Sequence, residues 1–326
     1  MTTFKEIRGT AIESVSSDPT NPEVGQIWYN NTIGVLKGYR SLGGVWATGG
    51  NLPVTNFQSG GAGPQTANVI FGGTAPPGAP QKTAATFEYD GSTWSPSGNM
   101  NTSRTAVAGA GTQTTALGAG GYLFPGSSSA AETYDGSTWT SITSMPSGNS
   151  YASAGTQTSA LYASAGTTSE YSAPAWTAGG ALNTPRQEGS MAGTQTAALF
   201  FGGGPQTAAS ALTEEYDGSA WTAGGTMNTA RGIQINGTGA SQTAAVAFGG
   251  SGPTEPQRTT ATELYDGTSW TNTGSLSTAR GNSSKGGSQG TSSSALCVGG
   301  YTATAVSNAV EEFTNPTFAA QKITTS

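Results

Sequence analysis

The stretch Tyr89-Asp90-Gly91-Ser92-Thr93-Trp94 decides the fold, because it returns along the chain at nearly regular intervals. Close copies stand at 134–139, 216–221 and 265–270, and degenerate copies at 171–176 and 313–318. All six keep two aromatic residues five positions apart, and about 45 residues separate most neighbouring copies. A period of this length indicates one supersecondary unit per repeat.

Two further elements accompany each aromatic unit. A short apolar run that ends in two small residues precedes it, at 67–73, 115–121, 161–166, 196–203, 244–250 and 295–300. An Arg-led segment follows four of the units, with Arg104, Arg186, Arg231 and Arg280 at the same position, and leads into a Gly/Ala/Ser stretch. The pattern predicts four short strands per repeat and an all-β chain.

The order of these elements resembles the kelch repeat, in which a Gly-Gly pair, a later Tyr and Trp, and an Arg that opens the next unit follow one another. The resemblance covers about 270 residues and implies a six-bladed, kelch-like β-propeller of four-stranded blades over residues 51–326. Propellers of this kind serve enzymes, scaffolds and lectins, so the resemblance specifies the fold better than the function.

The core of such a propeller follows from residue size. Blades converge on a central channel, so the small-residue segments 106–111 and 153–155 are expected as innermost strands. Trp residues of the aromatic units are expected to fill the gaps between neighbouring blades, namely Trp94, Trp139, Trp176, Trp221 and Trp270.

Residues 1–50 carry a different pattern. An alternating segment, 26–32 followed by 35–40, predicts a hairpin, with 45–47 as its third strand. A seventh blade is the alternative, but Tyr39 and Trp46 stand seven residues apart rather than five. We therefore expect a separate small module, preceded by an extended arm at 16–22.

This segment resembles short hairpin modules of tail-fibre and other virion proteins of tailed bacteriophages. The matching residues are Gly25, Trp28, Tyr29, Asn30, Leu36, Lys37, Tyr39 and Trp46. The resemblance implies attachment to other virion proteins through residues 1–50, with Trp28, Tyr29, Leu36 and Tyr39 as attachment residues. It also implies many copies per particle and a location in the virion, assembled in the host cytoplasm.

Composition excludes several kinds of function. The 326 residues contain no His and one Cys, so the commonest metal ligand, the usual neutral-pH base and an internal disulfide are missing. Twelve Lys and Arg against 18 Asp and Glu give a net charge of −6 and no basic stripe for nucleic acid. We expect no cofactor, no metal, no nucleic acid, no cleaved signal and no membrane insertion.

Three enzyme hypotheses apply to a propeller of this kind. The Asp-Gly turns come near the Asp-box of sialidase propellers, but a β-turn explains them, and calcium there would have only one carboxylate per turn. A copper radical oxidase requires His. Carboxylate pairs for glycoside hydrolysis would come from Glu88, Glu132, Glu170, Glu214, Glu263 and Glu311. We expect these Glu to form a solvated strand face instead, since they recur at one position per blade, on the strand before the aromatic residue.

Binding is expected at the loops after the Gly-Gly pairs, which differ most between repeats and lie together on one face. Tyr122, Phe124 and Tyr301 in these loops are candidates for stacking on sugar rings, without any catalytic residue. The sequence therefore predicts a non-enzymatic structural or adhesion protein of a tailed phage, a tail fibre, appendage or decoration, that binds a host-surface glycan or another subunit. A free carbohydrate-binding lectin and a glycan-active propeller enzyme are the alternatives.

Overall fold

A computed structural model describes residues 12–19, 26–40, 43–75, 81–148, 152–204, 209–232, 236–252, 258–285, 290–315 and 319–323. The chain divides into two compact units, residues 45–314 and a smaller unit made of residues 1–44 and 315–326. We call the smaller unit the terminal module. Among the described residues, no helix is long and apolar enough to cross a membrane.

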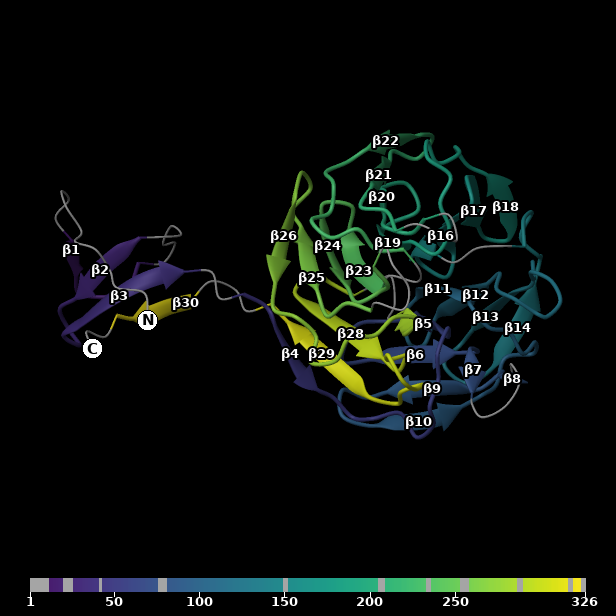
Figure 1. The fold of residues 1–326 in the computed structure, drawn as a ribbon, viewed down its shortest axis with the longest axis horizontal. Coiled ribbons are helices and arrows are strands. Elements are labelled where there is room, and N and C mark those ends of the chain that lie inside the picture. The colour runs from purple at the N-terminus through teal and green to yellow at the C-terminus, as the bar shows by residue number, and fades with distance from the viewer. Residues whose placement is uncertain are drawn as a thin grey trace. The chain divides into compact units, whose positions relative to one another are not determined.

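The large unit is a six-bladed β-propeller, as the repeats predict, and its six four-stranded sheets surround a common centre (Figure 1). Blades 1 to 3 comprise β5 (Gly60–Ala62), β6 (Asn68–Phe71), β9 (Thr86–Tyr89) and β10 (Trp94–Ser97); β11 (Ala108–Gly111), β12 (Ala116–Ala119), β13 (Ala131–Tyr134) and β14 (Trp139–Ile142); and β15 (Ala152–Gly155), β16 (Ser159–Ser164), β17 (Thr167–Ser172) and β18 (Ala175–Ala178). Blades 4 to 6 comprise β19 (Ser190–Gly193), β20 (Ala198–Phe201), β21 (Thr213–Tyr216) and β22 (Trp221–Ala223); β23 (Asn236–Ser241), β24 (Ala244–Phe248), β25 (Thr262–Tyr265) and β26 (Trp270–Thr273); and β27 (Ser284–Lys285), β28 (Ser294–Val298), β29 (Val310–Thr314) and β4 (Val45–Thr48).

Small residues form the innermost strands, which confirms the size argument for 106–111 and 153–155. β5, β11, β15, β19, β23 and β27 contact one another in sequence and close a ring. A Cβ atom on Gly109 of β11 would lie 2.4 Å from the carbonyl oxygen of Gly61 in β5. Only glycine allows this close approach, so the ring depends on the Gly/Ala/Ser composition of these strands.

Trp side chains join each blade to the one before it. The indole Nε1 of Trp139 donates to Thr86 Oγ1 of blade 1, and its ring lies 4.7 Å from that of Phe71 in the same blade. Trp221 and Trp270 donate in the same way to Thr168 and Thr213 of the preceding blades. The predicted role of these Trp between blades is therefore confirmed.

The last blade corrects the expected division at residue 50. Its outer strand is β4, where Trp46 pairs with Phe313, as Trp94 pairs with Tyr89 in blade 1. Trp46 Nε1 also donates to Thr262 Oγ1 of blade 5, as Trp139, Trp221 and Trp270 donate to a Thr of their preceding blades. Residues 45–47 thus do not extend the N-terminal hairpin, and Trp46 takes the place expected for Phe318, which lies outside the described residues.

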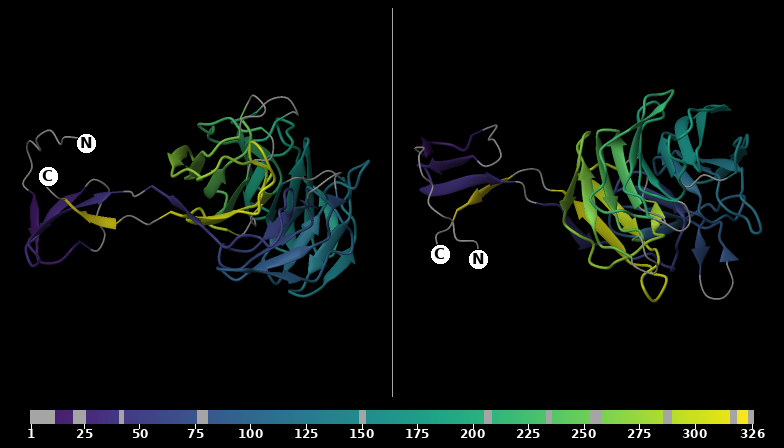
Figure 2. Two further views of the ribbon diagram at one scale, coloured as in Figure 1. Left: turned by 60° about the horizontal axis from the view of Figure 1, so that its bottom comes forward. Right: turned by 45° about the horizontal axis from the view of Figure 1, so that its top comes forward.

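The terminal module is a sheet with the order β1 (Glu13–Val15), β2 (Ile27–Asn30), β3 (Val35–Arg40) and β30 (Ala319–Lys322). β2 and β3 form the predicted hairpin. The C-terminal β30 pairs with β3, so residues 319–322 belong to the terminal module and the expectation that they form part of the propeller is wrong. β1 runs parallel to β2 along the sheet edge (Figure 2). Of the predicted arm at 16–22, residues 20–22 lie outside the described residues.

Candidate binding face

The four repeated Arg are buried and paired with Glu in the third strand of the same blade. Arg104 Nη2 lies 2.8 Å from Glu132 Oε1, and Arg231 Nη2 lies 2.7 Å from Glu263 Oε1. The other pairs are Arg186 with Glu214 and Arg280 with Glu311. These four Glu are buried, so the prediction of a solvated strand face is wrong for them.

Each of these carboxylates is also bonded to the main chain. Glu263 Oε2 accepts from the N–H of Asn228, whose side chain donates to the carbonyl oxygen of Trp270. Arg104 donates from Nη1 to the carbonyl oxygens of Gly120 and Ala130. The Arg–Glu pairs thus join the entry to a blade with its interior, and main-chain N–H groups and the Arg occupy the four Glu carboxylates.

Blades 1 and 3 lack all three members of this arrangement at once. At the positions of the Asn, the Arg and the Glu, blade 1 has Pro53, Asn56 and Phe87, and blade 3 has Pro146, Asn149 and Ser169. Proline has no N–H to donate to a carboxylate. This joint absence within one chain is the sequence signal that would have found the pairs.

A second set of Glu stands one position closer to the aromatic residue and accepts a hydrogen bond from the Tyr of the next blade. Tyr134 Oη donates to Glu88 Oε1 over 2.6 Å, and Tyr265 Oη donates to Glu215 Oε1 over 2.6 Å. The remaining pairs are Tyr216 with Glu170 and Tyr89 with Glu312. The six Glu grouped as one position in the sequence are therefore two structural positions.

The Asp-Gly segments are turns, in agreement with the structural interpretation. Asp90 Oδ1 accepts from the N–H groups of Thr93 and Ser92, and these bonds hold the pKa of the Asp90 carboxyl well below its usual range. Asp135, Asp217 and Asp266 make the same bonds. These carboxylates are used within their own turns.

Metal binding and thiol chemistry would depend on His, Cys, Asp or Glu side chains in the described part of the chain. No group of three or more His, Cys, Asp or Glu is placed there to hold an ion. Cys297 is buried in β28, and burial raises the pKa of its thiol.

Antiparallel pairing places the loops after the Gly-Gly pairs at the end of the blades opposite the Asp-Gly turns. We call these two ends the loop face and the turn face. The loop face comprises residues 74–83, 122–129, 205–210, 251–260 and 301–307, with gaps in the described residues at 76–80, 205–208 and 253–257. It also includes the residues that follow each Arg, which bridge to the loops.

Tyr122 and Phe124 lie together on this face. Their rings are 4.7 Å apart at an interplanar angle of 85°, and Phe124 is 51% exposed. The loop closes on itself, since Leu123 N donates to Gly126 O and Ser128 N donates to Gly121 O. The Tyr122 hydroxyl donates to the carbonyl oxygen of Pro125.

Tyr301 occupies the same repeat position in blade 6 but has other surroundings. Its ring lies 6.1 Å from that of Phe57, and the Arg258 guanidinium lies 4.8 Å from its ring centre. Tyr301 is therefore half-buried between neighbours and belongs to a different part of the loop face from Phe124.

The expected attachment residues of the terminal module divide by exposure. Trp28 is fully buried and donates to Asp18, whereas Tyr29 is 40% exposed. Leu36 pairs with Tyr29 and is half-buried, and Tyr39 pairs through its backbone with Ala320. Of the three whose side chains the structure describes, Trp28, Tyr29 and Leu36, Tyr29 is the most exposed.

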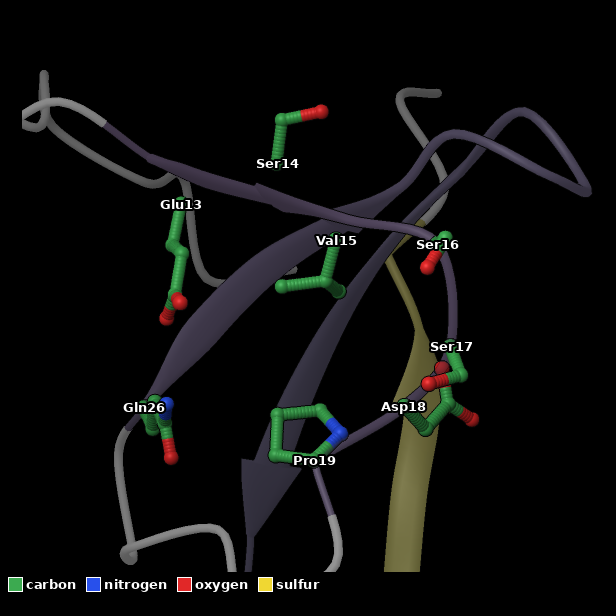
Figure 3. A pocket seen from close by; sticks show the side chains of 8 residues that line it. All are labelled: Glu13, Ser14, Val15, Ser16, Ser17, Asp18, Pro19 and Gln26. Atoms are coloured by element: carbon green, nitrogen blue, oxygen red, sulfur yellow. The ribbon is translucent and has the colours of Figure 1, made fainter.

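A hollow of about 680 Å³ lies beside β1 in this module. Figure 3 shows Glu13 and Gln26 at one side of it and Ser17 and Asp18 at the other. Asp18 also accepts hydrogen bonds from Lys37, Asn30 and Trp28, of which the Lys37 bond does most to lower its pKa to about 2. The Asp18 carboxylate thus joins the segment after β1 to residues of β2 and β3.

No protein-family model matches this sequence, and no curated protein matches it. Among solved structures, the protein YjhT covers 84% of this chain with 99% of its own length, at a TM-score of 0.62 and 13% sequence identity. At this identity the similarity concerns the fold alone. It agrees with the propeller architecture described above.

Proposed function

We propose that this protein is a non-enzymatic adhesion protein whose propeller presents the loop face to a saccharide of a cell surface. The observation that carries this proposal is Phe124, a large apolar side chain that is 51% exposed at the tip of a hydrogen-bonded loop. Aromatic rings fixed on rigid scaffolds offer an apolar face to the C–H groups of sugars while adjacent polar groups bond the hydroxyls.

The use of the charged repeat residues supports binding rather than catalysis. Arg–Glu pairs, Tyr–Glu bonds and Asp turns occupy these side chains in the structure of the blades. A catalytic acid or base needs instead a carboxyl or another titratable group directed at substrate.

The terminal module is proposed as the attachment element. Its hairpin resembles those of tailed-phage virion proteins, and Tyr29 offers an exposed aromatic side chain on β2. Display of many copies on a particle would multiply a modest affinity per propeller. In this proposal the protein is a tail fibre, appendage or decoration protein with a kelch-like propeller.

The test is binding of the labelled full chain to a glycan array and to bacterial cells. Phe124→Ala and Tyr122→Ala are expected to lower binding about 10-fold or more, because each removes part of the aromatic surface. Tyr29→Ala is the matched control, since it removes another exposed aromatic residue, 40% exposed against 51% for Phe124, outside the propeller. It should leave glycan binding unchanged and reduce incorporation into particles.

Undiminished glycan and cell binding by the Phe124→Ala protein would contradict the proposed face. Turnover of any array glycan, detected by mass spectrometry, would contradict the non-enzymatic assignment.

A further inference from the structure

Charges are distributed unequally between the two ends of the propeller. Four Asp lie in the turns of the turn face, and four Arg are buried in ion pairs. Two other cations lie on the loop face: Lys82, which bonds the carbonyl oxygen of Leu123, and Arg258, which lies over the ring of Tyr301. Glu188, in the segment before β19, is a carboxylate on this face, but it belongs to blade 4.

Lys82 connects the loops of blades 1 and 2. It lies in β8 (Gln81–Lys82), which pairs with β7 (Thr74–Ala75) within the loop of blade 1. Its ammonium group donates to the carbonyl oxygen of Leu123 in the loop of blade 2. Because that carbonyl belongs to the peptide unit that leads into Phe124, the positive charge lies at the backbone of the loop that carries the exposed aromatic residue.

The loop holds Phe124 in an unusual backbone conformation. Its φ of 43° lies in the left-handed region, which bulky residues rarely adopt. A glycine would occupy this position without strain, yet the chain places there an aromatic ring that is half in solvent. Strain that is not offset by full burial is a mark of functional positions.

The side of this loop toward blade 3 carries no comparable loop. The residue after the Gly-Gly pair contacts the following blade: the Thr74 hydroxyl donates a hydrogen bond to the Thr105 hydroxyl of blade 2. For Tyr122 the following blade is blade 3, where Ser164 pairs directly with Thr167 across a two-residue turn. A ligand can therefore approach Tyr122 and Phe124 without meeting a long loop of blade 3.

We propose that the site formed by Tyr122, Phe124 and Lys82 binds an anionic saccharide, a sugar ring that carries a carboxylate or a sulfate. The aromatic pair contacts the ring, and the Lys82 ammonium forms a charge-assisted hydrogen bond with the anionic group. This inference rests on the proposed function and adds the chemical class of its ligand.

The experiment measures the affinity of the full chain for three polymers that share one backbone: dextran, carboxymethyl-dextran and dextran sulfate. The wild-type protein should bind one or both charged polymers at least 10-fold more tightly than dextran, with a preference that declines as salt rises. A preference for one charged polymer identifies the anion as carboxylate or sulfate.

Lys82→Gln should remove this preference, and Lys82→Arg should keep most of it. Lys322→Gln, which makes the same change in net charge within the terminal module, is the control and should bind as wild type does. Equal binding of dextran and both charged polymers by the wild type, or unchanged preference in Lys82→Gln, would overturn the inference.

The two proposals fail in different ways. If Phe124→Ala weakens binding to neutral and charged polymers while Lys82→Gln changes nothing, the adhesion function stands and the anionic ligand is wrong. If Phe124→Ala and Tyr122→Ala bind every polymer and array glycan as wild type does, the proposed binding face itself is wrong.

Discussion

Arg231 and Glu263 show how a repeated ion pair can stabilise a blade interior. Both side chains are fully buried, and burial lowers the pKa of the Arg231 guanidinium while the Glu263 carboxylate opposes that shift. Such a pair is favourable only when every partner is present, since a lone buried charge is costly. The N–H of Asn228 donates to the second oxygen of Glu263, so both carboxylate oxygens have a partner.

Replacement of Arg231 alone should therefore destabilise the propeller strongly. We expect Arg231→Asn to lower the free energy of unfolding in urea by about 3–5 kcal/mol, because Glu263 is left buried without its cation. The triple variant Asn228→Pro, Arg231→Asn and Glu263→Phe copies blade 1 and should recover most of that loss. A triple variant less stable than Arg231→Asn would show that the Pro, Asn and Phe of blade 1 cannot replace the Asn, Arg and Glu of blade 5.

At this scale the sequence predicted the turns and the Trp contacts correctly because both depend on local spacing. Asp90 forms its turn with residues two and three positions away, and Trp139 follows at a fixed distance from Tyr134. The burial of Glu132 could not be obtained in this way. It depends on which side of the strand faces Arg104, 28 residues earlier.

Between blades, the Tyr–Glu bonds form a second connection besides the Trp side chains. Burial, followed by the Glu88 carboxylate, raises the pKa of Tyr134 to about 12. Tyr89, Tyr216 and Tyr265 have pKa values raised to about 12 for the same reasons. Blades 5 and 6 have Leu264 and Phe313 at the corresponding positions and so lack both partners.

These shifts predict a loss of stability at alkaline pH. Tyr in the unfolded chain loses its proton near pH 10, whereas these four in the folded protein keep it until about pH 12. The folded state binds more protons in this window, so the free energy of unfolding should fall as pH rises through it. Urea midpoints measured from pH 8 to 12 would show the decline.

The double variant Glu88→Leu and Tyr134→Phe copies the Leu264/Phe313 combination and is the control for that measurement. Its stability should depend less steeply on pH above 10 than that of the wild type. A urea midpoint that stays constant up to pH 12 in the wild type would contradict the assignment of these bonds.

Strand prediction failed at β4 for a physical reason. An outer strand needs to pair on one side only, so any segment that reaches the edge can supply it, here from the opposite end of the chain. The alternation of apolar and polar residues assigned Trp46 to the hairpin, because no residue near it in sequence indicates that it pairs with Phe313. The available signal was that Phe318, and no Trp, stands five positions after Phe313.

At the scale of the whole molecule, both ends of the chain contribute to both units. β4 closes the propeller, and β30 completes the sheet of the terminal module. Division at residue 50, as the sequence suggested, would remove β4 from blade 6. We expect the fragment 45–314 to fold and the fragment 51–314 to be markedly less stable, since Trp46 packs between Phe248 and Phe313.

In the proposed function, a closed six-bladed propeller carries the binding face by itself. The decisive measurement compares the affinity of fragment 45–314 for the best array glycan with that of the full chain. The fragment should therefore unfold cooperatively and bind within about twofold of the full chain. A fragment that unfolds cooperatively but has lost glycan binding would place the binding site in the terminal module and contradict this account.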